Sequence, residues 1–148
     1  MRLWRGLATV RHPLHSFLFG LIWQLTVDKT GHYAEHAGYW ETTAFLSEID
    51  RSKPMHFYDS NTGKLLFTAP IGRTWDDFLE ESRHHGWPSF RDAEVNWDYV
   101  RVLPNGEAVS VDGTHLGHDI PDQKGRRYCI NLVSVAAYGS ETSGRRDL

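Results

Sequence analysis

Apolar positions along the chain fall into short clusters that polar turn residues separate. Met55–Tyr58 and Leu65–Thr68 are two such clusters, with a glycine-containing loop between them. Tyr99–Leu103 and Ala108–Val111 form a second pair around Pro104–Glu107. Short apolar runs on either side of a glycine-containing turn are typical of β-hairpins. The pattern therefore predicts two hairpins.

One clear helix is predicted after Thr74, whose hydroxyl can cap the free amides of the first turn. Asp76 and Asp77 suit the helix dipole, and Gly86 is a typical residue for the end of the helix. A second, shorter helix is predicted over Glu41–Ile49. The apolar face of the first helix consists of Trp75, Phe78 and Leu79.

The last predicted strand is Arg127–Val135, and residues 139–148 are polar. Several hairpins, one closing strand and few helices indicate a mainly β fold. We expect an N-terminal extension over residues 1–50, a main domain over 51–138 and a flexible tail over 139–148.

The first 27 residues of the extension have a distinctive composition. Residues 1–27 hold no acidic residue and several arginines, and Leu14–Leu25 has apolar positions at helical spacing. Such a segment is either a targeting sequence or a helix packed on the domain. We expect a cytoplasmic protein by default, and an organellar or exported one if residues 1–27 direct targeting.

Composition narrows the function classes. The net charge of −3 gives no reason to expect nucleic-acid binding. Cys129 is the single cysteine of the 148 residues, which excludes an internal disulfide and makes a cysteine-based zinc site untenable. Cys129 is therefore either an inert buried thiol or a thiol that performs chemistry.

The strand pattern places Cys129 on a polar face. Side chains alternate in a strand, so Arg127, Cys129 and Asn131 share one face while Tyr128 and Ile130 face the core. A nearby guanidinium favours the thiolate, which is the nucleophilic form. The alternative is that this neighbourhood arises by chance.

Two further motifs carry candidate chemistry. His115 and His118 stand three residues apart; they can bind a metal, line a pocket as hydrogen-bonding groups, or have no role. Asp122 can orient a histidine. Trp87, in the run Gly-Trp-Pro-Ser-Phe that ends at Phe90, is either a core residue or an apolar wall for a ligand.

Taken together and in this order, GWPSF (86–90), HLGH (115–118) and RYCIN (127–131) resemble the methionine-R-sulfoxide reductases of the MsrB family. The resemblance covers about Met55 to Ala137. It implies an MsrB-like fold of two antiparallel β-sheets with a few peripheral helices. It also implies reduction of methionine-R-sulfoxide, free or peptide-bound, to methionine.

In this family, a cysteine thiolate attacks the sulfoxide sulfur and becomes a sulfenic acid, which assigns the nucleophile to Cys129. Trp87 and Phe90 then form the substrate wall. The remaining catalytic positions implied by the resemblance are His115, His118, Asn131, Arg127 and Asp122.

The chain departs from the family at two places. Many members bind a structural zinc through two CxxC pairs, whose positions here hold Asp59, Thr62, Val109 and Asp112. We therefore expect no metal and no cofactor. Some members carry a resolving cysteine at the position of His85, so here an external thiol, namely thioredoxin, glutaredoxin or glutathione, must reduce the sulfenic acid.

Two other functions remain open. The same fold can act as a non-catalytic binding module, or Cys129 can serve as a redox sensor whose oxidation is the signal. We expect a monomer whose partners are the thiol reductant and the oxidised protein or free methionine sulfoxide, with no nucleic acid.

Overall fold

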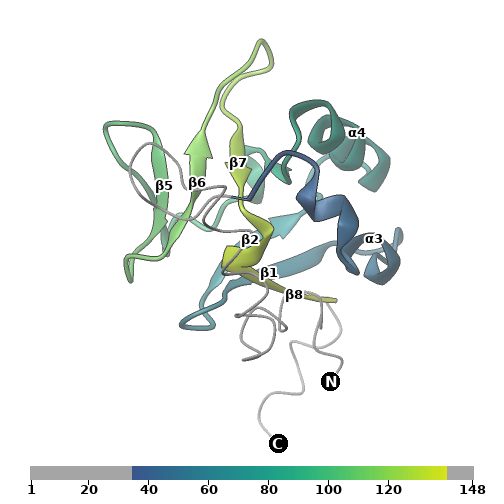
Figure 1. The fold of residues 1–148 in the computed structure, drawn as a ribbon, viewed down its shortest axis with the longest axis horizontal. Coiled ribbons are helices and arrows are strands. Elements are labelled where there is room, and N and C mark those ends of the chain that lie inside the picture. The colour runs from purple at the N-terminus through teal and green to yellow at the C-terminus, as the bar shows by residue number, and fades with distance from the viewer. Residues whose placement is uncertain (1–34, 140–148) are drawn as a thin grey trace, which may run out of the picture.

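The computed structural model describes residues 35–139, and the strands form two antiparallel sheets (Figure 1). The first sheet has the order β2-β1-β8. Its strands are β1 (Met55–Asp59), β2 (Leu65–Ala69) and β8 (Val135–Gly139). Strand β8 comes from the end of the described chain and pairs with β1 along five residues, so it closes the domain onto its first hairpin.

The second sheet has the order β3-β7-β6-β5-β4. Its strands are β3 (Ser89–Phe90), β4 (Val100–Val102), β5 (Glu107–Ser110), β6 (His115–Asp119) and β7 (Tyr128–Ile130). Both predicted hairpins are confirmed, as β1–β2 and β4–β5. The prediction of a mainly β fold with two antiparallel sheets and few helices is confirmed as well.

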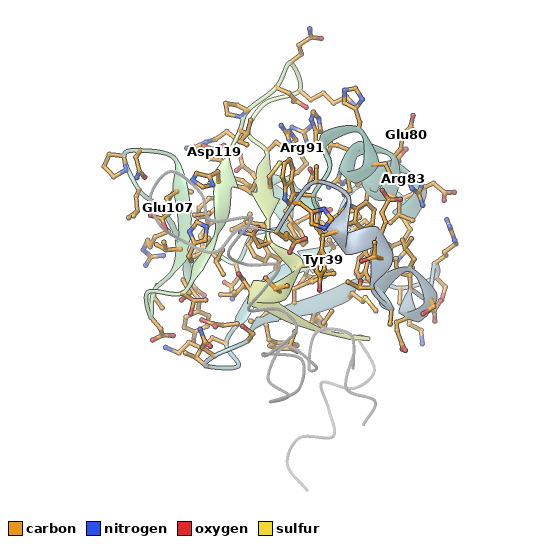
Figure 2. All side chains as sticks on the ribbon, viewed as in Figure 1. Tyr39, Glu80, Arg83, Arg91, Glu107 and Asp119 are labelled. Atoms are coloured by element: carbon orange, nitrogen blue, oxygen red, sulfur yellow. The ribbon has the colours of Figure 1, made fainter. Side chains whose placement is uncertain are left out.

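Helix α4 (Trp75–His85) begins and ends at the predicted residues. The Thr74 hydroxyl accepts a hydrogen bond from the Asp77 N–H, and the Asp77 carboxylate accepts one from the Thr74 N–H. Gly86 ends the helix with a φ of 93°, a left-handed conformation that favours glycine. The predicted apolar face is buried, whereas Glu80 and Arg83 project from the exposed side of the helix (Figure 2).

Two predicted elements are wrong in detail. The helix expected over 41–49 is a 3-10 turn, η2 (Tyr39–Thr42), followed by a short helix, α3 (Phe45–Glu48). Thr43 separates them, because its hydroxyl donates to the Trp40 carbonyl and accepts from the Phe45 N–H. Another 3-10 turn, η3 (Asp92–Glu94), follows β3.

The strand expected over 127–135 is in fact two strands of different sheets. β7 ends at Ile130, the 3-10 turn η4 (Leu132–Ser134) follows, and β8 then begins in the other sheet. The Asn131 carbonyl accepts from the Ser134 N–H and so closes the turn. The apolar run continues because Ile130, Leu132, Val133 and Val135 are all buried, which hides the break from a reading of hydrophobicity alone.

The hydrophobic core lies between the sheets and under α4, and it is rich in aromatic side chains. Trp40 and Phe45 are fully buried in it, so residues ahead of position 51 are part of the same core. Within residues 35–139, no helix is long and apolar enough to cross a membrane. The predictions for residues 1–27 and for most of the tail lie outside the described residues.

Gly117 allows the backbones of β6 and β7 to approach closely. A Cβ atom built at Gly117 would lie 1.9 Å from the carbonyl oxygen of Cys129 and 2.9 Å from the Cα of Ile130. These are backbone atoms, so a side chain at this position can be accommodated only if the two strands move apart.

We therefore expect Gly117→Ala to lower the free energy of unfolding by about 3 kcal/mol or more. The control is Gly63→Ala, where φ is 77° but the space is open, and the expected loss is about 1 kcal/mol. Urea unfolding of both variants measures the difference. Equal losses would contradict the close approach.

Candidate functional site

Four side chains form a row across one face of the second sheet. Ser89 of β3 and His118 of β6 are the residues directly opposite Cys129 of β7, and Glu107 of β5 is directly opposite His118. Residues opposite one another in an antiparallel pair share a face. The thiol therefore has a hydroxyl on one neighbouring strand and an imidazole on the other.

A bulge brings His115 to the same face. In a regular strand, side chains three residues apart point to opposite faces. The pairing between β5 and β6 is shifted, however. Ala108 is opposite Gly117 and Val109 is opposite His115, so Leu116 is an extra residue in β6. Val109 and Glu107 share a face, so His115 joins His118 there. The two imidazole rings lie 5.5 Å apart, edge to face.

A carboxylate orients His115. Glu107 Oε2 lies 2.6 Å from His115 Nδ1, and both side chains are mostly buried. This contact places a proton at Nδ1 and stabilises the charged imidazolium. Glu107 lies at the start of β5, on the part of the second sheet that is remote from α4 (Figure 2). Its role was not predicted from the sequence, because the bulge that brings it to His115 has no local signature.

The Cys129 thiol is nearly enclosed, with the residue 7% exposed. Arg127 Nη1 donates to Sγ, and Ser89 Oγ lies 3.8 Å from Sγ. Burial raises the pKa of Cys129 above its ordinary value, while the charge and hydrogen bond of Arg127 and the hydrogen bond of Ser89 offset part of this rise. The guanidinium thus lowers the pKa as expected, but burial has the larger effect.

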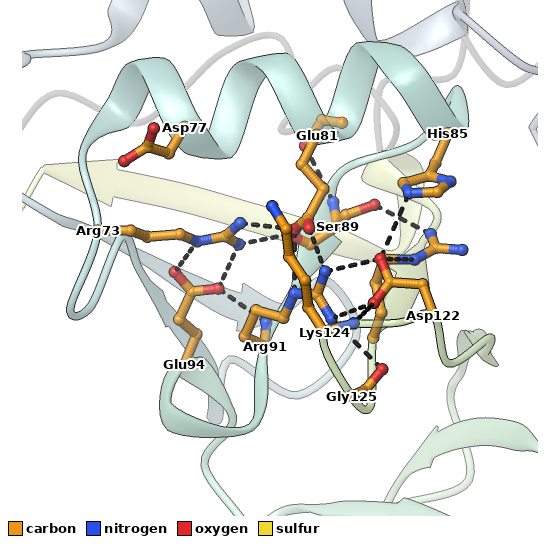
Figure 3. Close-up of polar contacts among 12 residues, drawn as sticks. Arg73, Asp77, Glu81, His85, Ser89, Arg91, Glu94, Asp122, Lys124 and Gly125 are labelled. Atoms are coloured by element: carbon orange, nitrogen blue, oxygen red, sulfur yellow. Dashed lines mark hydrogen bonds and ion pairs between the residues drawn. The ribbon is translucent and has the colours of Figure 1, made fainter.

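Alternating charges connect Arg127 to helix α4, and Figure 3 shows the part of this network formed by Asp122, Arg91 and Glu81. Arg127 Nε lies 3.8 Å from Asp122 Oδ2, and Arg91 Nη2 donates to the same oxygen at 2.8 Å. Arg91 also donates to Glu81, which accepts from Arg73 Nη1 at 2.6 Å. A buried guanidinium such as that of Arg127 requires nearby negative charge, which this network supplies.

Asp122 belongs to this network and not to the paired histidines. Hydrogen bonds from Arg91 hold the pKa of Asp122 well below its usual range, so the carboxylate stays charged. Its nearest histidine is His85, whose Nε2 lies 3.7 Å from Oδ2. The carboxylate that contacts a histidine of the HLGH motif is that of Glu107, at His115, and a role of Asp122 in orienting a histidine stays a prediction.

An open cleft of about 1180 Å³ lies beside α4 and the loop between β6 and β7. Its lining includes His84, His85, Arg91, Asp122 and Lys124, and it is strongly charged. Among the described residues, neither Cys129 nor Trp87 lines this cleft. The cleft and the polar row around the thiol are therefore different surfaces. Asp122 lines the cleft and also lies beside Arg127, which donates to the Cys129 thiol.

Two further candidate residues, Trp87 and Asn131, lie close to the ends of strands β3 and β7. Asn131 follows β7 directly, and its Nδ2 donates to the Leu116 carbonyl at 3.1 Å. Trp87 lies two residues before Ser89, is partly exposed, and donates its indole N–H to the backbone carbonyl of Glu35. Glu35 also contacts Asn131, and it too was missed from the sequence because these contacts join distant segments.

Phe90 does not fit the expected role in substrate binding. It is fully buried and stacks on Phe67 at 4.4 Å between ring centroids, with Phe57 and Phe78 edge-on to it. Alternation explains this placement, because Phe90 points to the core when its neighbour Ser89 points to the thiol.

The comparisons with known proteins agree with the sequence motifs. The peptide methionine sulfoxide reductase MsrB of Methanosarcina mazei is 38% identical over 71 residues, which cover 40% of this chain and 50% of the relative. The protein of the same name from Methanosarcina barkeri is 38% identical over 72 residues, or 41% of this chain and 49% of the relative. These matches show that the chain is similar to MsrB proteins over about two fifths of its length. The chain spans about half the length of these MsrB relatives, and no protein-family model matches it.

The positions at which many MsrB proteins bind zinc hold other interactions here. Thr114 Oγ1 donates to the buried carboxylate of Asp59, and Lys64 Nζ lies 3.2 Å from Asp112. These contacts join the β1–β2 loop to the β5–β6 loop. The other two of the four positions hold Thr62 and Val109. Zinc does not fit this set, because Val109 has no ligand atom and the carboxylates of Asp59 and Asp112 already contact Thr114 and Lys64. Among residues 35–139, no cluster of three metal-ligating side chains occurs.

The environment of Cys129 predicts a specific pH dependence. Alkylation by iodoacetamide requires the thiolate, so its rate should rise with pH to a midpoint above the ordinary cysteine value. Arg127→Met removes the positive charge and should move the midpoint to still higher pH, with Arg127→Lys between the two. The control is Arg126→Met, an exposed arginine paired with Asp119. An unchanged midpoint in Arg127→Met would contradict this account.

Proposed function

We propose that the chain reduces methionine-R-sulfoxide, free or peptide-bound, to methionine with Cys129 as the nucleophile. The observation that supports this function is the row of Ser89, Cys129, His118 and Glu107 on one sheet face, in a chain related to MsrB. The proposal is supported by the proximity, in this row, of a thiol to groups whose chemistry allows proton exchange. The choice of the R epimer rests on the family resemblance.

The proposed chemistry is a two-electron oxygen transfer. The Cys129 thiolate attacks the sulfoxide sulfur, while an imidazolium, His115 or His118, donates a proton to the oxygen. The sulfur–oxygen bond breaks and the protonated oxygen leaves as water. A water molecule then attacks Sγ and breaks the bond between the two sulfurs, so methionine leaves reduced by two electrons and Cys129 becomes a sulfenic acid. Glu107 stabilises the protonated form of His115 and so maintains the acid. Arg127 stabilises the thiolate, with Asp122 holding Arg127 in place.

An external thiol completes the cycle in this proposal. No second cysteine is present in the 148 residues, so the sulfenic acid cannot form an internal disulfide. One thiol condenses with it and releases water, giving a mixed disulfide, and a second thiol releases the Cys129 thiol and a disulfide. Thioredoxin, glutaredoxin or glutathione can supply these two electrons.

The decisive experiment supplies dithiothreitol and each epimer of dabsylated methionine sulfoxide. We expect turnover of the R epimer alone, and loss of turnover in Cys129→Ser because a hydroxyl is not a competent nucleophile here. Chromatography of the dabsylated methionine measures the product. Failure to reduce either epimer at high dithiothreitol would reject the proposal, and rapid oxidation of Cys129 by peroxide under those conditions would favour a redox sensor.

The carboxylate at His115 gives a second test. Glu107→Gln keeps the shape of the side chain but removes the charge that stabilises the imidazolium, so kcat should fall by about tenfold or more. The effect should be largest at high pH, where the less basic imidazole loses its proton first. Glu80→Gln, an exposed change on α4, serves as the control. A Glu107→Gln variant with the kcat of the wild type would remove His115 from the proton transfer.

A further inference from the structure

Glu35 contacts three separate parts of the candidate site. Its backbone N–H donates to Asn131 Oδ1 at 3.0 Å, and its backbone carbonyl accepts from Trp87 Nε1 at 2.8 Å. Its side-chain Oε1 accepts from the Val133 N–H at 3.1 Å. One residue thus joins the segment before β3, the residue after β7 and the turn η4.

These contacts are long-range and shielded from water. Glu35 is 52 residues from Trp87 and 98 residues from Val133 along the chain. It is 4% exposed, and its Oε2 is buried with no hydrogen-bond partner among residues 35–139. Water cannot readily replace a buried hydrogen bond, so each contact strongly constrains the groups that it joins.

The side chain of Glu35 holds its own backbone in place. The bond to Val133 anchors Glu35 to η4, and this anchor fixes the two backbone groups that orient the Asn131 amide and the Trp87 indole. An indole held at its N–H has a fixed ring plane. The Asn131 amide also has a fixed plane, because its oxygen accepts from the Glu35 N–H and its nitrogen donates to the Leu116 carbonyl.

We propose that Glu35 is a positioning residue, which fixes Trp87 and Asn131 beside Cys129 and thereby sets the affinity for the substrate. This inference rests on the proposed reductase function and extends it to a segment ahead of the three sequence motifs. Glu35 does not touch the reacting sulfur in this proposal. It acts through the indole and the amide, which contact the substrate.

The substitutions separate hydrogen bonding from charge. Burial raises the pKa of Glu35 to about 8, so the carboxyl is mostly neutral at pH 7 and Glu35→Gln reproduces its shape and charge. Glu35→Ala removes the acceptor for Val133. Glu35→Asp keeps the carboxyl group but shortens the side chain by one methylene. This variant is used in place of Glu35→Ala if the alanine variant does not fold.

Two measurements on the full chain at pH 7 test the proposal. The first gives KM and kcat for the R sulfoxide with dithiothreitol. We expect Glu35→Ala to raise KM by roughly tenfold, because misplacement of binding groups by about 1 Å can cost a hundredfold. The alkylation rate of Cys129 should stay near the wild-type value. Glu35→Gln should restore KM to within about threefold.

The second measurement does not need activity. NMR follows hydrogen exchange of the Trp87 indole N–H, identified among the six tryptophans by its loss in Trp87→Phe. Exchange should be roughly tenfold faster in Glu35→Ala and unchanged in Glu35→Gln. The matched control is Glu41→Gln, an exposed glutamate of the same segment that pairs with Arg83.

The outcomes are distinct. If Glu35→Ala lowers stability but leaves KM and indole exchange at wild-type values, Glu35 is only structural and the proposal is overturned. If the wild type reduces neither epimer, the proposed function fails, and the indole exchange still decides whether Glu35 positions Trp87.

Discussion

Strand β7 is hydrogen-bonded along both edges, and this double pairing determines where every polar group near Cys129 lies. β3 brings Ser89 to one side of the thiol, and β6 brings His118 to the other. Neither neighbour can shift without breaking a ladder of backbone hydrogen bonds, so the groups are held in place before a ligand arrives. The strand is only three residues long, which makes the close backbone approach at Gly117 important for the whole arrangement.

The thiol experiences two opposing electrostatic effects. Burial disfavours the thiolate, and the guanidinium of Arg127 favours it. The guanidinium is itself buried, so its place beside the thiol depends on Asp122, and Asp122 in turn is fixed by Arg91. Acidic groups on α4 and its neighbouring loops therefore influence a cysteine on the sheet that they do not contact (Figure 3).

The sequence predicted the elements whose signals are local. The hairpins and helix α4 were found because turn residues and the Thr74 cap act within a few positions. The neighbours of Cys129 on its own strand followed from alternation. The bulge at Leu116, the partner of Asp122 and the contacts of Glu35 were missed, because each depends on segments that meet only after folding.

The extra residue in β6 makes the length of this strand as important as its composition. With Leu116 in place, both histidines and Glu107 lie on the same face of the sheet as the thiol, while the leucine side chain is buried in the core. Loss of Leu116 would restore regular alternation with both imidazoles still on one face, whereas regular pairing with Leu116 retained would turn one imidazole toward the other face of the sheet. In natural or engineered relatives, a change that removes the bulge would therefore alter the chemistry even where every motif residue is retained.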